Sequence, residues 1–285
     1  MEYYIVDAFS EQPFGGNTAG VVLIDRGCDY PDDLTLRHIA AEFRYSETAF
    51  VRAEDDGSFT TRYFTPTGEV PLCGHATIAA FGVLRERGLV TDGQHHVNRT
   101  LAGPLKVTPN PVVMMQMAEP VLIGTLDSLA TQRLCRIMGL GRTTTLPVQI
   151  VSTGLPDIMF PVEDNETLQA LQPDMKALSD FSQEHEVVGV HAFALGGHGV
   201  TAHVRNFAPR YGIDEEAATG TSNAALTYYL YRNEAIEPLA RCTFLQGEAL
   251  QRSSLITTTL TAHADTCDIE TGGPYRIVAQ GFLKL

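Results

Sequence analysis

Short runs of apolar and β-branched residues, separated by turn-forming residues, dominate the first part of the chain. In the clearest case, Phe59, Thr61 and Tyr63 alternate with more polar neighbours, which is typical of a half-buried strand. The pattern predicts strands at Glu2–Phe9, Gly20–Ile24, Thr48–Arg52 and Ser58–Phe64.

Two stretches have helical spacing instead. Apolar residues recur at i, i+3, i+4 and i+7 between Pro31 and Phe43, and proline suits the first turn of a helix. A second helix is expected from His75 to about Arg87, with Gly88 at the position just past its end. This second helix is apolar nearly all round, so it must be buried on most sides.

The second half of the chain repeats this plan. Tyr63-Phe-Thr-Pro66 parallels Asn206-Phe-Ala-Pro209, and Gly74-His-Ala-Thr-Ile-Ala79 parallels Gly220-Thr-Ser-Asn-Ala-Ala225. Around these segments the pattern predicts a second buried helix and four more strands, at Ser222–Tyr231, Leu146–Val151, Ile158–Val162, Val187–Leu195 and Thr201–Phe207.

The repeat implies two similar domains, each a curved sheet around a central helix, with the two helix starts facing one another across a cleft. Four prolines cluster near Val107–Pro120, where the chain is expected to pass from one domain to the other. We expect an N-terminal domain of residues 1–115 plus 275–285, and a C-terminal domain of residues 116–274.

Composition limits the partners. The 34 acidic and 20 basic residues give a formal charge of −14, which disfavours nucleic acid and anionic membranes but permits a small anionic substrate. The N-terminus lacks the pattern of a secretory signal, and no apolar run is long enough to span a bilayer. The five cysteines are widely spaced without any CxxC pair, which favours a reduced, cytoplasmic chain.

The two predicted helix starts, at Gly74 and Gly220, could carry chemistry. Each brings unpaired backbone N–H groups and the positive end of a helix dipole to one point, which suits a carboxylate. The alternative is ordinary helix capping by the neighbouring Thr and Ser residues.

Two side chains could transfer protons. Glu47 lies where a helix gives way to a strand, bracketed by apolar residues, and burial there would let it act as both acid and base. A solvated surface glutamate is the alternative. Cys73 precedes a helix, which lowers the pKa of a thiol, but it could equally be a small buried residue.

Other patterns exclude several classes of protein. His185, His191, His198 and His203 fall in one stretch, but their spacing matches no zinc site. The chain has no dinucleotide fingerprint, no P-loop and no GxSxG nucleophile elbow. We therefore expect no metal and no cofactor.

Six segments together resemble the PhzF-like family of phenazine biosynthesis, in the family's order and over nearly the whole chain. They are Val6-Asp-Ala-Phe9, Pro13-Phe-Gly-Gly-Asn17, Ser46-Glu-Thr-Ala-Phe50, Tyr63-Phe-Thr-Pro66, Leu72-Cys-Gly-His-Ala-Thr77 and Ala218-Thr-Gly-Thr221. The resemblance implies an α+β fold similar to diaminopimelate epimerase. Such a fold has two pseudo-symmetric domains, each a β-barrel-like sheet wrapped around a central helix.

The resemblance also implies an isomerase whose catalytic acid/base is Glu47. It implies that substrate is bound by Asn17, Gly74, His75, Glu216, Gly220 and Thr221. The second motif reads Glu-Ala-Ala-Thr-Gly-Thr where the family usually has Asp and Ser at its ends, so Glu216 and Thr221 reshape the pocket.

The comparison with diaminopimelate epimerase bears on mechanism, because such racemases use two thiols. Here Cys73 has Thr219 as its counterpart, and a hydroxyl cannot replace a thiolate as base at neutral pH. One-base proton transfer through Glu47 on a small carboxylate-bearing substrate is therefore expected. A racemase using Glu47 with Cys73 and a non-catalytic binding protein remain as alternatives. A homodimer is the default oligomer.

Overall fold

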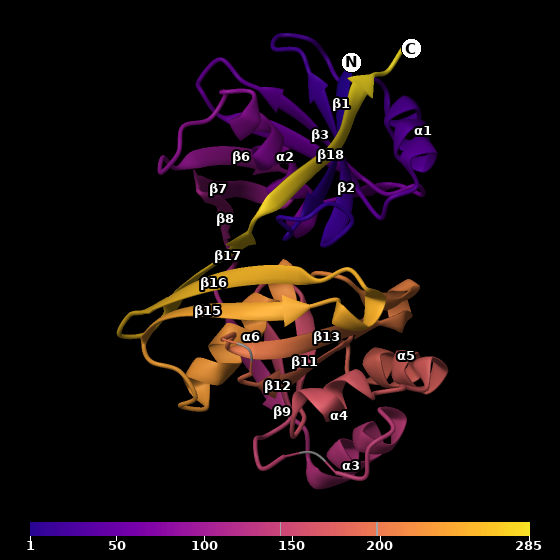
Figure 1. Cartoon of the computed structure of the whole chain (residues 1–285), viewed down its shortest axis with the longest axis vertical. Helices are drawn as coiled ribbons and strands as arrows, with labels where there is room; N and C mark the ends of the chain where they lie inside the picture. The colour runs from indigo at the N-terminus through magenta and orange to yellow at the C-terminus, as the bar shows by residue number, and fades with distance from the viewer. Residues whose placement is uncertain (143, 198) are drawn as a thin grey trace. The chain divides into compact units, whose positions relative to one another are not determined.

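The computed structural model describes residues 1–142, 144–197 and 199–285, which divide into two compact units (Figure 1). Unit 1 comprises Met1–Gln116 and Gly272–Leu285, and unit 2 comprises Met117–Thr271. The last strand, β18 (Tyr275–Phe282), pairs antiparallel with β1 (Glu2–Ala8). Both ends of the chain therefore lie in unit 1.

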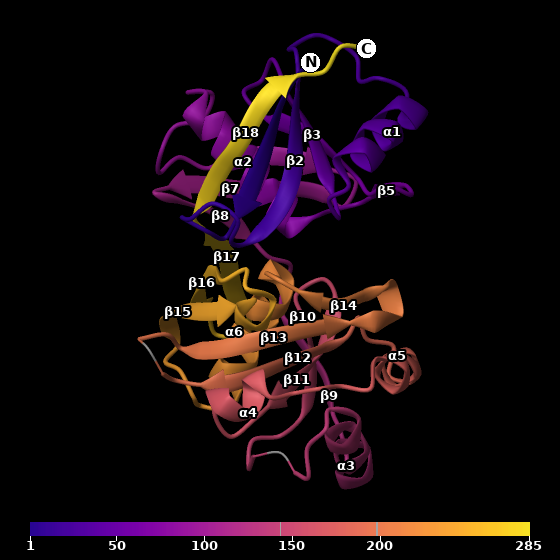
Figure 2. The same ribbon diagram turned by 45° about the vertical axis from the view of Figure 1, so that its right-hand side comes forward.

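Unit 1 is built around one buried helix, α2 (Gly74–Glu86). Every residue from His75 to Leu84 is buried, which confirms the expectation of a helix enclosed on all sides. The strands that contact α2 include β1, β18, β2 (Asn17–Ile24) and β3 (Thr48–Ala53), as Figures 1 and 2 show. The other elements of this unit are α1 (Asp33–Phe43), β4 (Phe59–Phe64), β5 (Glu69–Val70), β6 (His96–Thr100), β7 (Gly103–Asn110) and β8 (Val112–Gln116).

Unit 2 is built the same way around α6 (Gly220–Arg232). Its strands are β9 (Val121–Thr125), β10 (Gln149–Ser152), β11 (Pro156–Pro161), β12 (Val190–Leu195), β13 (Ala202–Ala208), β14 (Ile213–Glu216), β15 (Leu239–Gln246) and β16 (Ser254–Ala262), and β17 (Cys267–Gly273) leads back to unit 1. Three further helices and two short 3₁₀ turns complete it, at α3 (Ser128–Ile137), α4 (Asn165–Gln169), α5 (Met175–Glu184), Pro209–Tyr211 and Glu248–Leu250.

Each unit has a second apolar layer outside its sheet. In unit 1, Leu36 and Ile39 of α1 pack with Phe50 and Phe64 of the strands. A larger cluster in unit 2 joins residues of α3, α4 and α5 to the strands β10, β11 and β12. None of the helices in the described residues is long and apolar enough to cross a membrane.

The two units share one pattern of strand pairing. In unit 1, β1–β2 is antiparallel, β2–β3 parallel, β3–β4 antiparallel, β4–β6 parallel and β6–β7 antiparallel. Unit 2 repeats this order: β10–β11 is antiparallel, β11–β12 parallel, β12–β13 antiparallel, β13–β15 parallel and β15–β16 antiparallel. This repeat confirms the predicted α+β fold with two pseudo-symmetric halves.

The registers of the paired strands make individual residues equivalent. Thr48 is paired with Phe64 in unit 1, and Val190 with Phe207 in unit 2. The two Phe-x-Pro segments therefore occupy equivalent places, as the sequence comparison indicated. Gly74 and Gly220 each begin the central helix of their unit, which confirms that part of the comparison as well.

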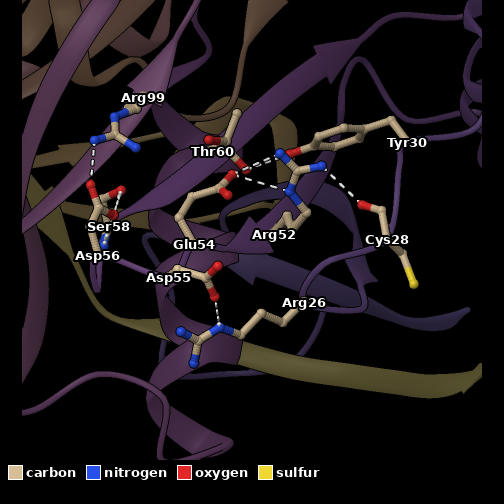
Figure 3. Close-up of polar contacts among 10 residues, drawn as sticks. All are labelled: Arg26, Cys28, Tyr30, Arg52, Glu54, Asp55, Asp56, Ser58, Thr60 and Arg99. Atoms are coloured by element: carbon tan, nitrogen blue, oxygen red, sulfur yellow. Dashed lines mark hydrogen bonds and ion pairs between the residues drawn. The ribbon is translucent and has the colours of Figure 1, made fainter.

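Ion pairs hold the β3–β4 hairpin (Figure 3). Arg52 binds Glu54 at 3.0 Å, and Asp56 in the turn binds Arg99 of β6 at 2.6 Å. The first contact lies within the hairpin, and the second ties it to β6. They thereby fix β3, the strand that directly follows Glu47.

Several expected starts were wrong: β2 begins at Asn17 rather than Gly20, and β10 at Gln149 rather than Leu146. Two others have a clear physical reason. Asp32 caps the first helix by accepting a hydrogen bond from the Thr35 N–H at 2.9 Å, so the helix begins at Asp33 and Pro31 lies outside it. The strand expected from Val187 begins only at Val190, because the Val187 N–H closes the end of α5 on the Ser182 carbonyl at 3.0 Å.

Candidate functional site

Glu47 lies in the short connection from α1 to β3. Helix α1 ends at Arg44, which adopts the left-handed conformation with φ 61°. The chain then turns into β3, and the Glu47 carbonyl accepts a hydrogen bond from the Gly20 N–H of β2 at 3.3 Å. The side chain is 19% exposed, so its carboxylate is held at the edge of the sheet yet remains accessible.

The imidazole of His75 is the centre of the cluster in unit 1. Its Nε2 lies 3.4 Å from Glu47 Oε2 and 3.4 Å from Ser46 Oγ. Its Nδ1 lies 3.4 Å from Asn17 Nδ2 and 3.4 Å from Cys73 Sγ. The structure thus brings Asn17, Glu47, Cys73 and His75 together, and adds Ser46, which the sequence analysis did not assign.

His75 is neutral near pH 7. Burial lowers its pKa, since only 5% of the side chain is exposed, and the charge of Glu47 opposes this effect without overcoming it. An amide N–H of Asn17 faces Nδ1, so the imidazole proton belongs on Nε2, facing the Glu47 carboxylate. The imidazole can then hold Glu47 in place by a hydrogen bond.

Asn17 is positioned by a loop that a buried carboxylate organises. Asp7 of β1 is 2% exposed, and it accepts hydrogen bonds from Thr18 Oγ1 at 2.6 Å and from the Phe14 N–H at 2.7 Å. Gly16 has φ +64°, and a Cβ there would lie 2.1 Å from a backbone carbonyl oxygen of β1. The sequence analysis assigned no role to Asp7, although a charged residue inside an apolar strand is a usable signal.

The start of α2 presents open backbone amides beside this cluster. Cys73 is the N-cap residue with an extended backbone, and its side chain makes no capping hydrogen bond. Thr77 Oγ1 instead donates to the Cys73 carbonyl at 2.7 Å. The alternative of side-chain capping is therefore not observed here, and the first-turn amides of Gly74 and His75 can bind an anion.

The start of α6 is organised by polar contacts within unit 2. Thr219 is its N-cap residue, and its hydroxyl donates to Glu216 Oε2 at 2.7 Å rather than capping the helix. Gln246 Nε2 donates to the Glu216 carbonyl at 2.8 Å, and Gln246 Oε1 accepts from the Thr219 N–H at 3.1 Å. Glu216, Gly220 and Thr221 are thus neighbours, and Gln246 is a further member that sequence reasoning missed.

A buried carboxylate also anchors the start of α6. Asp157 of β11 accepts hydrogen bonds from Ser222 Oγ at 2.6 Å and from the Gly189 N–H at 3.0 Å. Burial raises the pKa of Asp157 to about 6, and both hydrogen bonds oppose the rise. Like Asp7, it stands out in the sequence as an acidic residue in an apolar strand.

The residue of unit 2 equivalent to Glu47 is Gly189. Each directly precedes the equivalent strands β3 and β12. The Glu47 carbonyl accepts from the Gly20 N–H at 3.3 Å, and the Gly189 carbonyl accepts from the Ile158 N–H at 3.0 Å. A Cβ at Gly189 would lie 1.9 Å from the Phe207 carbonyl oxygen, so unit 2 has no room for a side chain here.

The central helices differ in the same way. Cys73 and His75 at the start of α2 correspond to Thr219 and Thr221 at the start of α6. Unit 1 therefore carries a carboxylate, a thiol and an imidazole at positions where unit 2 carries a glycine and two threonines.

Three of the four histidines considered earlier lie apart from these clusters, and His198 falls outside the described residues. His191 is buried with Nδ1 3.0 Å from Asn206 Oδ1, and burial lowers its pKa to about 4. His203 Nδ1 lies 2.7 Å from Glu248 Oε2. Both make polar contacts inside unit 2.

Sequence comparisons match the chain along most of its length. A family model described as phenazine biosynthesis-like protein matches residues 6–273. An uncharacterized isomerase of Clostridium acetobutylicum is 33% identical, over 89% of this chain and 87% of the relative. A trans-2,3-dihydro-3-hydroxyanthranilate isomerase of Pseudomonas aeruginosa is 31% identical, over 88% of this chain and 87% of the relative.

A solved structure shows the same fold. The phenazine biosynthesis protein of the PhzF family from Bacillus anthracis matches 100% of this chain and 99% of its own, with a TM-score of 0.88 and 24% identity. The resemblance seen in the sequence motifs is thereby confirmed.

Proposed function

The chain belongs to the phenazine biosynthesis-like family, and on that premise we propose that it is an isomerase that needs no cofactor and moves a proton between two carbons of a small carboxylic acid. Its similarity to proteins named isomerases supports the general class of reaction. Isomerisation of this kind relocates one proton and one electron pair within a molecule. It therefore needs no oxidant, reductant or second substrate.

The observation that carries the proposal is the contrast between Glu47 and Gly189. Equivalent backbone positions hold a carboxylate in one unit and no side chain in the other. The nearest carboxyl group to Gly189 is Asp157, which is buried and engaged by Ser222 and the Gly189 N–H. This distribution favours a single general base over two bases acting on opposite faces of one carbon.

In the proposed mechanism, Glu47 acts first as base and then as acid. A C–H bond of the substrate breaks, its proton passes to a carboxylate oxygen of Glu47, and the electron pair shifts the double bond. The proton then leaves Glu47 and forms a new C–H bond at the other end of the shifted system. The Nε2–H of His75 holds the carboxylate throughout, because the neutral imidazole has a proton to donate there.

Binding of the substrate is assigned to the remaining residues. The first-turn amides at Gly74 and His75 suit a carboxylate, as does the helix start at Gly220 and Thr221. Asn17 and Glu216 supply an amide and a carboxylate for polar substituents of the substrate. These roles are proposals that rest on the residue types and on their placement within each unit.

The relatives suggest the first compound to test. We would incubate the metal-free protein with trans-2,3-dihydro-3-hydroxyanthranilate, and with other small unsaturated carboxylic acids, in deuterated water, and follow the products by NMR. The proposal predicts a product with a shifted double bond, part of which retains the substrate's own proton. Inversion at one carbon with full solvent deuterium in the product would instead indicate an epimerase.

A further inference from the structure

Glu47, Cys73 and His75 form a group of potential metal ligands. A carboxylate oxygen, the thiol sulfur and an imidazole nitrogen of these residues all lie within 4.8 Å of one another. The three residues come from two separate segments of unit 1, the α1–β3 connection and the start of α2. Their convergence is therefore a property of the fold.

The distances approach those of a tetrahedral zinc site. Zinc lies about 2.3 Å from sulfur and about 2.0–2.2 Å from nitrogen or oxygen, so donor atoms in such a site are about 3.3–3.6 Å apart. His75 Nε2 is 3.4 Å from Glu47 Oε2 and 3.9 Å from Cys73 Sγ. The third pair, a Glu47 carboxylate oxygen and Cys73 Sγ, lies within 4.8 Å, so side-chain shifts of about one ångström would bring all three donors to coordination distance.

The surroundings of His75 suit a ligand. Its other nitrogen, Nδ1, faces the side-chain amide of Asn17 at 3.4 Å, and only 5% of the residue is exposed. Zinc binding through Nε2 moves the ring proton to Nδ1, and the Asn17 amide would then turn its oxygen toward Nδ1 to accept it, which is how metal-bound imidazoles are typically held. Nε2 is the nitrogen that faces Glu47, whereas Cys73 Sγ lies 3.4 Å from Nδ1 and 3.9 Å from Nε2, so the thiol must move toward Nε2 to share an ion.

We infer that this cluster binds one zinc ion through Glu47, Cys73 and His75 Nε2, with water in the fourth position, and that the ion inhibits the protein. The combination of thiolate and imidazole selects zinc or cobalt over magnesium or calcium. Because a carboxylate bound to zinc cannot take up and release a proton, the bound ion stops the reaction that we assign to Glu47. The binding site stands on the geometry alone, and only its inhibitory effect rests on the proposed function.

Cobalt(II) gives a direct test of the site. Titration of the reduced, metal-free protein with Co²⁺ should give one equivalent of bound ion, with visible bands of a tetrahedral site and a thiolate-to-cobalt charge-transfer band. Zinc should displace the cobalt and abolish the visible bands and the charge-transfer band. Cys73→Ser should lose the charge-transfer band and weaken binding at least about tenfold, since even the loss of a supporting residue costs 10–100-fold.

The matched control is Cys267→Ser, which removes a partly exposed thiol of unit 2 outside the cluster and should leave the spectrum unchanged. Glu47→Gln should weaken binding while keeping the charge-transfer band. Absence of a saturable one-to-one spectrum, or its loss in Cys267→Ser rather than Cys73→Ser, would overturn the inferred site.

Turnover separates this inference from the proposed function. Zinc should lower the rate of isomerisation, a chelator should restore it, and magnesium should have no effect. Isomerisation without any zinc binding would refute only the metal site. If activity disappears on chelation and returns with zinc, then zinc does not inhibit the protein and the isomerisation is not independent of a cofactor.

Discussion

Gly189 holds in unit 2 the backbone position that Glu47 holds in unit 1. The carbonyl of each residue accepts one hydrogen bond from the neighbouring parallel strand, at 3.0 Å for Gly189 and 3.3 Å for Glu47. The repeated fold thus preserves the backbone at this position while the chemistry differs. In one unit the position presents a carboxylate, and in the other it permits close approach of two strands.

Gly189→Ala should strongly destabilise the protein. The new Cβ would lie 1.9 Å from the Phe207 carbonyl oxygen, so the two strands must separate, and we expect the free energy of unfolding to fall by at least about 2 kcal/mol. Denaturant unfolding measures this change. Gly124→Ala is the control, because a Cβ there meets no atom within 4 Å, and it should change stability by less than about 0.5 kcal/mol. Equal effects of the two changes would contradict the close approach.

Gly16→Ala should impair both stability and catalysis. Gly16 combines φ +64° with a Cβ position 2.1 Å from the Ala8 carbonyl oxygen, so alanine would displace the loop that carries Asn17. We expect a fall in kcat/KM of at least about tenfold, together with a loss of stability of about 2 kcal/mol or more. Gly57→Ala is the control, because Gly57 also has a positive φ, of +80°, but a Cβ there meets no atom within 4 Å. This substitution should lower the free energy of unfolding by only about 1–2 kcal/mol and leave kcat/KM unchanged.

Asp157 gives a prediction about pH. Its pKa is raised by burial from the ordinary 3.8 to about 6, so folding favours the protonated form. The stabilisation that this preference provides is complete below pH about 4 and is lost as the pH rises through about 6. Asp157→Asn keeps a polar partner for Ser222 and the Gly189 N–H but cannot become charged.

The stability of Asp157→Asn relative to the original protein should therefore rise by about 2–3 kcal/mol between pH 4 and pH 7.5. Paired denaturant titrations at both pH values measure it, and the difference between the proteins cancels the effects of other titrating groups. A pH-independent difference would show that this carboxyl group has an ordinary pKa.

Cys73→Ala should reduce turnover less than Glu47→Gln does. The thiol contacts His75 at 3.4 Å, but its counterpart in unit 2 is Thr219, which cannot complete a pair of thiol bases. We expect kcat to fall by less than about tenfold, measured with the substrate that the deuterium experiment identifies. A complete loss of turnover would favour the alternative of a racemase using Glu47 with Cys73.

Much of the fold could be predicted from the sequence where local pattern and tertiary packing agree. The nearly uniform apolar character of α2 and α6 indicated their burial, and Gly74 and Gly220 marked their starts. The start of α1 was misjudged because Asp32, not Pro31, determines where that helix begins. Capping depends on which side chain reaches a free N–H, and spacing alone does not show this.

The site was only partly predictable for a related reason. The motifs identified Glu47, Cys73 and His75, but the equivalence of Glu47 and Gly189 appears only when strand registers are compared. The two connections that precede these residues differ, since one contains α1 and the other contains α4 and α5. Sequence spacing therefore does not align the two positions.

The most direct test of the account is proton exchange by Glu47→Gln. Glutamine keeps the size and hydrogen-bonding ability of Glu47 but removes the group that carries the proton, and general acid–base catalysis contributes about 10²–10⁴-fold. With an isomerised substrate in deuterated water, the account predicts that Glu47→Gln slows both double-bond migration and proton exchange by at least about 10²-fold, with unfolding behaviour unchanged. Exchange by Glu47→Gln at the original rate, with Cys73→Ala inactive, would contradict the account and assign the proton transfer to the thiol.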